Sequence, residues 1–109
     1  MAIYLARAKY SNAAFKGMID MPQDREAGGR KLVEALGMTL HQVYFSVNTA
    51  ESVFTVEGTA ENIAAMEMVA SSTGTIESIE ALEIIDSKSM TAAMATANKV
   101  VSAYQAPNK

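Results

Sequence analysis

Few side chains in this sequence are suited to chemistry, and none belongs to a complete catalytic motif. The chain has no cysteine and one histidine, His41. Without cysteine there is no thiolate nucleophile, disulfide or cysteine-ligated metal site. The serines lie outside any GxSxG motif, and there is no second base to complete a triad with His41. No clustered acidic partners surround the histidine in the sequence to form a ligand set. We therefore expect no metal and no cofactor.

His41 nevertheless has a chemical interpretation. In an apolar cavity it would be a general base, or a ligand of haem or of a metal. The alternative is a structural or edge-exposed histidine, which the lack of partner ligands favours. Strict alternation along its strand places His41 on the same face as Val43, Phe45 and Val47.

Arg7 and Lys9 point to the same side of a strand predicted over residues 2–10. Two cations in an apolar cavity are suited to holding an acidic ligand. Cross-strand ion pairs with glutamates are the favoured alternative, because buried charges are usually paired. Tyr44 would add a phenolic hydrogen bond to such a site, although tyrosine more often packs with its hydroxyl at the surface.

The elements that must position these residues follow the order βαββαβ, with one extra helix. Alternation and turn residues predict strands over 2–10, 38–47, 52–58 and 75–85, and helical spacing and caps predict helices from about 13, over 22–36, over 59–73 and over about 87–104. This order is the ferredoxin-like arrangement of the α+β class, a four-stranded antiparallel sheet with helices on one face. The length of 109 residues fits a single domain, 1–109.

One face of the predicted sheet has no helical cover, although the strands carry apolar residues on both sides. An apolar face of that extent must be buried. The simplest arrangement is a dimer in which two sheets meet and leave a narrow cavity between them. The C-terminal helix has a broad apolar face that includes Met90, Met94 and Val101. It either reaches to the partner or covers a sheet edge.

The glycine pair Gly28–Gly29 interrupts the helix predicted over 22–36. Each glycine disfavours a helix by about 1 kcal/mol relative to alanine. Close packing against the sheet or a partner explains the pair, and a bend in the helix is the alternative. The segment "AGGRK" is superficially similar to a phosphate-binding loop, but the spacing GxxxxGK[ST] is absent.

Net charge and hydropathy exclude some classes of binding partner. The formal net charge of −3 disfavours nonspecific binding to nucleic acid, which needs a basic surface. The apolar run at the N-terminus is too short for a signal peptide or a membrane span. We therefore expect a cytoplasmic protein that binds neither nucleic acid nor membrane.

Three segments together resemble the GYD-domain proteins, small bacterial and archaeal proteins of largely unknown function. "YLARAKYS" is similar to the family's opening strand, "LVEALGMTLHQVYFSV" to its helix, turn and strand ending in Tyr-Phe, and "SAYQAP" to its closing helix. The resemblance covers most of the chain. It implies a ferredoxin-like dimeric α+β barrel and no particular reaction.

The sequence departs from this family at the signature that names it. Aligned without a gap, Asn48 falls on the glycine, Ala50 on the tyrosine and Glu51 on the aspartate. Asn48 is suited to a left-handed backbone conformation, and Glu51 keeps the negative charge, but Ala50 lacks the aromatic ring. We expect Glu51 to face solvent, because an unpaired carboxylate in a small apolar cavity would be costly.

These observations favour a homo-oligomeric module with an intersheet cavity that binds a small acidic or apolar ligand or serves in interactions. Arg7, Lys9, His41, Tyr44 and Glu51 are the candidate ligand-binding residues. One alternative is a cofactor-independent enzyme, by analogy with the monooxygenases and isomerases among related dimeric barrels. A second is a structural protein assembled through its C-terminal helix.

Overall fold

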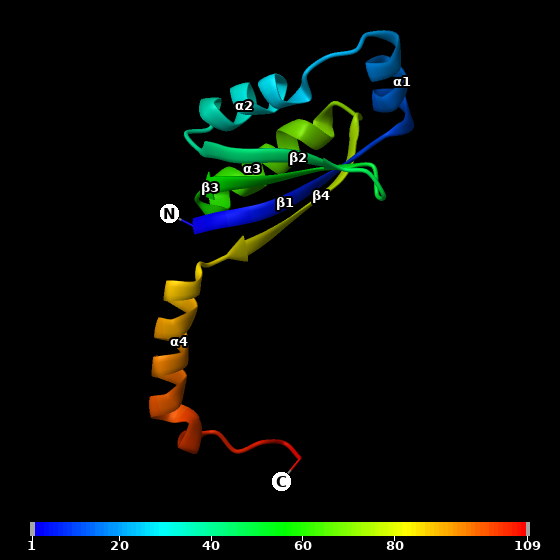
Figure 1. Cartoon of the computed structure of the whole chain (residues 1–109). Coiled ribbons are helices and arrows are strands. Elements are labelled where there is room, and N and C mark those ends of the chain that lie inside the picture. Colours follow the sequence, from blue (N-terminus) through cyan, green and yellow to red (C-terminus); the bar gives the residue numbers. More distant parts are fainter. Residues whose placement is uncertain (1, 109) are drawn as a thin grey trace.

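The computed structural model describes residues 2–108 and contains the predicted order of elements (Figure 1). The strands are β1 (Ala2–Tyr10), β2 (Thr39–Ser46), β3 (Glu51–Gly58) and β4 (Ile76–Ile84), and the helices are α1 (Asn12–Asp20), α2 (Arg25–Ala35), α3 (Ala60–Ser72) and α4 (Ser87–Val100). A short 3-10 turn, η1 (Val101–Ala103), follows α4. The α+β, ferredoxin-like fold class is thereby confirmed.

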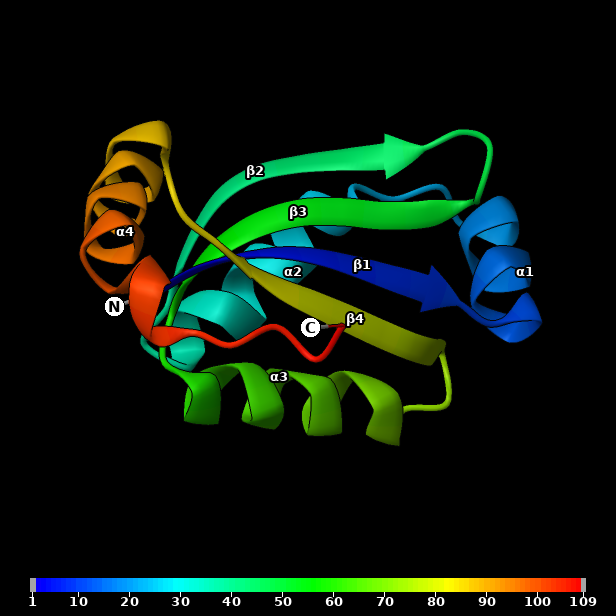
Figure 2. The same ribbon diagram turned by 90° about the horizontal axis from the view of Figure 1, so that it is seen from below.

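The four strands form one antiparallel sheet in the order β2-β3-β1-β4. Helices α2 and α3 lie over one face, and α1 stands beyond the end of β1 where that strand leaves the sheet (Figures 1 and 2). We call the face under α2 and α3 the helix face and the opposite one the open face.

Side-chain caps explain where the helices begin. The Ser11 hydroxyl accepts a hydrogen bond from the backbone N–H of Ala14, and the Asp24 carboxylate accepts one from Glu26. Thr59 and Asn62 form a reciprocal capping box at the start of α3. These contacts satisfy N–H groups that have no partner in the first helical turn, so polar side chains at these positions set the starts of α1, α2 and α3.

The core lies between the helix face, α2 and α3. Its buried residues are Val33, Met38, Leu40, Val56, Ile63 and Met66. Gly58 permits one close contact, because the Met38 side chain lies 2.5 Å from the position that a Cβ of residue 58 would occupy. Val33 of α2 and Ile63 and Met66 of α3 thus pack on the helix face near the start of β1 and the end of β3.

A four-residue loop, 47–50, joins β2 to β3. The backbone N–H of Ala50 donates a hydrogen bond to the carbonyl of Ser46, at 2.9 Å. Ala50 has φ 56°, and within residues 2–108 it is the one non-glycine residue with a positive φ. Asn48, although suited to the left-handed conformation, does not adopt it. The left-handed residue is Ala50, the last residue of the loop, whose N–H makes the hydrogen bond to Ser46.

Helix α4 leaves the end of β4 and extends away from the sheet on the side of the open face (Figures 1 and 2). Its N-cap is Asp86, whose carboxylate accepts a hydrogen bond from the N–H of Ser89 at 2.7 Å. No residue of α4 is buried, so the predicted helix forms without a partner in its own domain. Within residues 2–108, no helix combines the length and apolar character needed to cross a lipid bilayer.

Candidate functional site

The cations Arg7 and Lys9 lie on the open face, and both pair with glutamates. Arg7 is opposite Glu80 in the β1–β4 ladder, and its Nη2 lies 2.7 Å from Glu80 Oε2. This hydrogen bond raises the pKa of Arg7, so the guanidinium is always charged. Lys9 Nζ lies 3.7 Å from a carboxylate oxygen of Glu77. An acidic ligand at these cations would have to compete with carboxylates already present.

Glu51 belongs to the same group of charges. Its Oε1 lies 4.0 Å from Nη1 of Arg7, and its side chain is only 14% exposed. The expectation that Glu51 faces solvent is therefore wrong. The neighbouring guanidinium offsets the cost of partly burying the carboxylate, so Glu51 is placed as a partner for Arg7.

His41 is on a different face from the one that strict alternation predicts. The β2–β3 register passes from Leu40 opposite Val56 to Gln42 opposite Thr55, so His41 is an extra residue in a β-bulge. Its Nε2 lies 3.0 Å from Oε1 of Glu57 on the open face. Two of its predicted neighbours are on the helix face, where Val43 lines a cavity and Phe45 stacks on Tyr10. The third, Val47, lies in the loop after β2.

The open face does not gather all five candidate residues into one site. Tyr44 is opposite Val53 and its side chain is 64% exposed. Glu57, the partner of His41, is six residues along β3 from Glu51, a separation of about 20 Å in a strand. Arg7, Lys9 and Glu51 are therefore neighbours, whereas His41 lies near the other end of the sheet.

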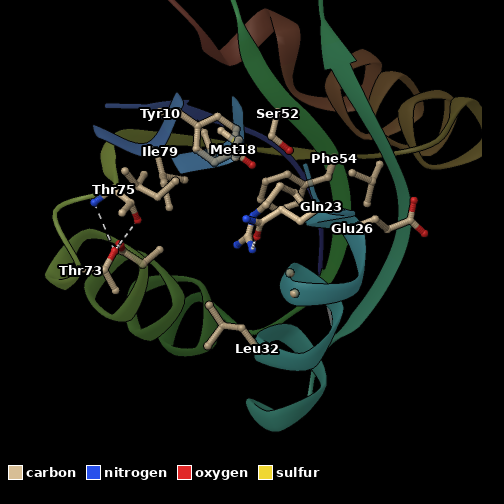
Figure 3. A pocket seen from close by; sticks show the side chains of 18 of the residues that line it. Tyr10, Met18, Gln23, Glu26, Leu32, Ser52, Phe54, Thr73, Thr75 and Ile79 are labelled. Atoms are coloured by element: carbon tan, nitrogen blue, oxygen red, sulfur yellow. Dashed lines mark hydrogen bonds between the residues drawn. The ribbon is translucent and has the colours of Figure 1, made fainter. Parts of the chain in front are cut away.

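A cavity of about 660 Å³ lies on the opposite side of the sheet, between the helix face and α1, α2 and α3 (Figure 3). Most of its lining is apolar. Side chains that line it include Ala8, Phe54 and Ile79 from the sheet, Met18 from α1, Leu32 from α2 and Met66 from α3. The cavity is on the face that the sequence reasoning assigned to the core.

Small residues on α1 and α2 leave room for this cavity. Gly17 and Gly29 line it, and a Cβ at either position would meet nothing within 4 Å. At Gly28 a Cβ would approach only the side chain of Arg25, at 3.0 Å. The interpretation of Gly28–Gly29 as a pair packed closely against the sheet is therefore wrong, since both glycines line the cavity. Packing of this pair against a partner stays a prediction.

The polar groups around the cavity come from different elements. Arg25, the first residue of α2, donates a hydrogen bond from its Nη1 to Oε1 of Gln23, which precedes the helix, at 2.9 Å. The Thr73 and Thr75 hydroxyls are hydrogen-bonded to each other between α3 and β4 (Figure 3). Such groups at the edge of an apolar cavity can orient a bound molecule through its polar atoms.

Sequence reasoning missed the cavity residues because it looked for charged and titratable side chains on strands. Most of the missed residues are small or apolar and lie on helices or in connections. The available signal was the helical spacing of Ala13, Ala14 and Gly17, followed by the Gly28–Gly29 pair. At Gly17 and Gly29 no other group fills the space that a side chain would occupy, so this part of the cavity stays open.

Comparisons with known proteins bear on the family. A protein-family model described as the GYD domain matches residues 4–94, which is most of the chain. A search among curated proteins found no match. Across residues 2–108, no three His, Asp or Glu side chains are grouped so as to hold a metal ion.

Proposed function

The chain belongs to the GYD domain family, and we propose that it is a homo-oligomeric module that binds a small, largely apolar molecule between its sheet and its helices. The cavity of about 660 Å³ is the observation that carries this proposal. Sites for small molecules have volumes of about 300–1,000 Å³, with an apolar lining and a few polar groups that fix orientation. The Gln23–Arg25 pair and the Thr73–Thr75 pair are groups of that kind.

The open face supports the homo-oligomeric part of the proposal. In the β1–β4 register Ile3 is opposite Ile84 and Leu5 is opposite Leu82. Leu82 is 63% exposed in a single copy. Apolar side chains clustered in this way are typical of a surface that associates, and pairing two open faces would remove them from water.

The helix-side cavity suits an apolar ligand better than a cavity between two sheets does. The open face carries the ion pairs of Arg7 with Glu80 and Lys9 with Glu77. These charges would line part of an intersheet cavity, where they favour polar contacts across the dimer. Desolvating them around an apolar molecule would be costly.

We propose binding rather than catalysis because of where the titratable candidates lie. A general base has to reach the reacting atom within hydrogen-bond distance, directly or through one water. His41 lies on the face opposite the cavity and contacts Glu57. Arg7 and Lys9 are on that opposite face too, each beside a glutamate. The cofactor-independent enzyme therefore has no support from the geometry of these residues.

A titration with the uncharged fluorescent probe N-phenyl-1-naphthylamine tests the site. Gly29 lines the cavity, and a Cβ at this position would have no atom within 4 Å. Gly29→Leu therefore directs a side chain from α2 into the cavity. We expect the variant to bind the probe at least about tenfold more weakly than the natural chain, a loss of about 1.4 kcal/mol. Unchanged affinity in Gly29→Leu would show that the probe binds elsewhere.

Two control variants separate cavity filling from other effects. Gly29→Ala improves helix propensity by up to about 1 kcal/mol but fills little of the cavity, so it should retain most of the binding. Lys31→Leu adds a leucine at an exposed position of α2 outside the cavity lining, and it should bind like the natural chain. Because leucine also favours helix more than glycine does, lost binding in Gly29→Leu would not result from a destabilised α2.

A further inference from the structure

We infer that α4 is an arm that packs along a second copy of this chain. This inference rests on the homo-oligomeric part of the proposed function and identifies α4 as a segment that contacts the partner copy. One side of α4 and the turn after it is apolar and exposed, with Met90 at 48%, Met94 at 58%, Val101 at 67% and Tyr104 at 72%. Met90 and Met94 are four residues apart and so lie on one face of α4, whereas Val101 and Tyr104 lie in and after η1.

The helix has no support from its own domain. It has 14 residues, and none of them is buried. Isolated helices shorter than about 12–15 residues are marginal in water, because nucleation is costly and no packed face stabilises them. A stable α4 therefore requires a surface that covers its apolar side.

A single copy exposes more surface than a compact protein of its mass, as expected if α4 is covered by a partner. The chain exposes 7814 Å², whereas a compact protein of 11.6 kDa exposes about 5,800 Å². The radius of gyration is 18.1 Å, against about 13 Å for a compact domain of this length. Obligate dimers bury about 2,000–5,000 Å² in total, so an excess of about 2,000 Å² per copy is of the size that such an interface removes.

The position of α4 places this area where a second copy would sit. The helix stands on the open-face side of the sheet (Figures 1 and 2). Its base adjoins the paired residues Ile3 and Ile84, and the next residue, Ile85, is 56% exposed. The open face and α4 are thus two walls of one surface. A second sheet seated on the open face would be flanked by the helix.

The charges favour a second copy as the occupant. On the open face, Arg7 and Lys9 are outnumbered by four carboxylates, those of Glu51, Glu57, Glu77 and Glu80. The charged side chains within α4 are Lys88 and Lys99. Lysines of an arm beside the carboxylates of the partner's open face would offset the repulsion between two faces that each carry more carboxylates than cations. A two-fold axis lets each copy give one arm and receive one, which closes the assembly as a dimer.

Single cysteines in the full chain test the inference, because the natural sequence has none. Met94→Cys places a thiol on the apolar side of α4, and Ala95→Cys places one about 100° further round the helix. We expect light scattering to give the mass of a dimer or larger oligomer. In that assembly Met94→Cys should react with a maleimide at least about tenfold more slowly than Ala95→Cys. Dilution to the monomer should abolish the difference.

Other results would overturn the inference. An oligomer in which both thiols react at the same rate would leave the homo-oligomer intact but remove the arm. A monomer with both thiols reactive would remove the arm and the homo-oligomer together. Protection of Met94→Cys in a monomer at every concentration would mean that α4 folds onto its own chain. Protection that appears only with anionic vesicles would mean that a membrane covers the helix.

A pair of charged variants gives an independent readout. Met94→Glu buries a carboxylate in the inferred interface, whereas Ala95→Glu places the same charge on the other side of the helix. We expect the first variant to lower the oligomer's mass at concentrations where the second keeps it. Equal masses for the two variants would contradict the inference.

Discussion

The His41 imidazole and the Glu57 carboxylate face each other across the β2–β3 ladder, with Nε2 3.0 Å from Oε1. The bulge between Leu40 and Gln42 creates this relationship, because it turns His41 onto the open face. The single histidine is thereby separated by the sheet from the cavity under the helices. Its placement favours an exposed hydrogen bond with Glu57 over a role in that cavity.

Replacing His41 should therefore leave binding in the cavity unchanged. His41→Ala should bind N-phenyl-1-naphthylamine like the natural chain. The variant should change the free energy of unfolding by less than about 1 kcal/mol, because an exposed contact between two polar side chains contributes little. Fluorescence titration and urea unfolding measure the two quantities, with Glu57→Gln as the control for loss of the same pair. Weaker probe binding in His41→Ala alone would place the histidine in the site.

The hairpin loop offers a test of local strain. Ala50 has φ 56°, and a left-handed conformation costs a residue with a Cβ about 1–2 kcal/mol. Glycine relieves that cost but gains unfolded-state freedom worth about 0.5–1 kcal/mol. Ala50→Gly should therefore raise the free energy of unfolding, measured by urea denaturation, by up to about 1.5 kcal/mol. Thr49→Gly, at a position without positive φ, should lower it, and equal losses in both variants would contradict the observed loop.

The order of elements was predictable from the sequence because each element carries its own signal. Alternation predicted the four strands, and capping residues such as Ser11, Thr59 and Gly74 stand at the ends of the helices. The face of His41 was not predictable, because a bulge inserts one residue and reverses the alternation after it. This error affected only β2.

The candidate site was harder to predict than the fold. The cationic candidates Arg7 and Lys9 were correctly placed on one strand face, and the favoured pairing with glutamates is found there. The cavity exists because no side chain fills the space beside Gly17 and Gly29. Empty space between packed elements has no residue type of its own, so alternation and spacing alone did not reveal it.

Adjacent residues of β4 provide a matched test of association through the open face. Leu82 is opposite Leu5 on that face, and Glu83, opposite Tyr4, points to the other side. Leu82→Lys should shift the protein toward monomer in light scattering, because it places an ammonium group in an apolar contact. Glu83→Lys introduces the same side chain on the other side and should leave the mass unchanged. Identical masses for both variants would argue against the open face as the interface.

The start of α4 should respond to acid. Hydrogen bonds from Ser89 lower the pKa of Asp86 below its ordinary value. A lowered carboxyl pKa stabilises the folded helix above the unfolded pKa, and this contribution is lost as the pH falls through the folded pKa. We expect the helical circular dichroism of the natural chain to fall on acidification more than that of Asp86→Asn, which keeps a capping side chain without the titration. Parallel curves for the two proteins would contradict this account.

Binding in the helix-side cavity is tested most directly by methyl resonances of methionine during a titration. Met18, Met21 and Met66 line the cavity, whereas Met90 and Met94 lie on α4. With methyl-labelled methionine and N-phenyl-1-naphthylamine as the probe, the resonances of the first three should shift in a saturable manner. Those of the α4 methionines should remain in place. Shifts confined to Met90 and Met94, or no shift at the cavity methionines under saturating probe, would contradict the proposed site.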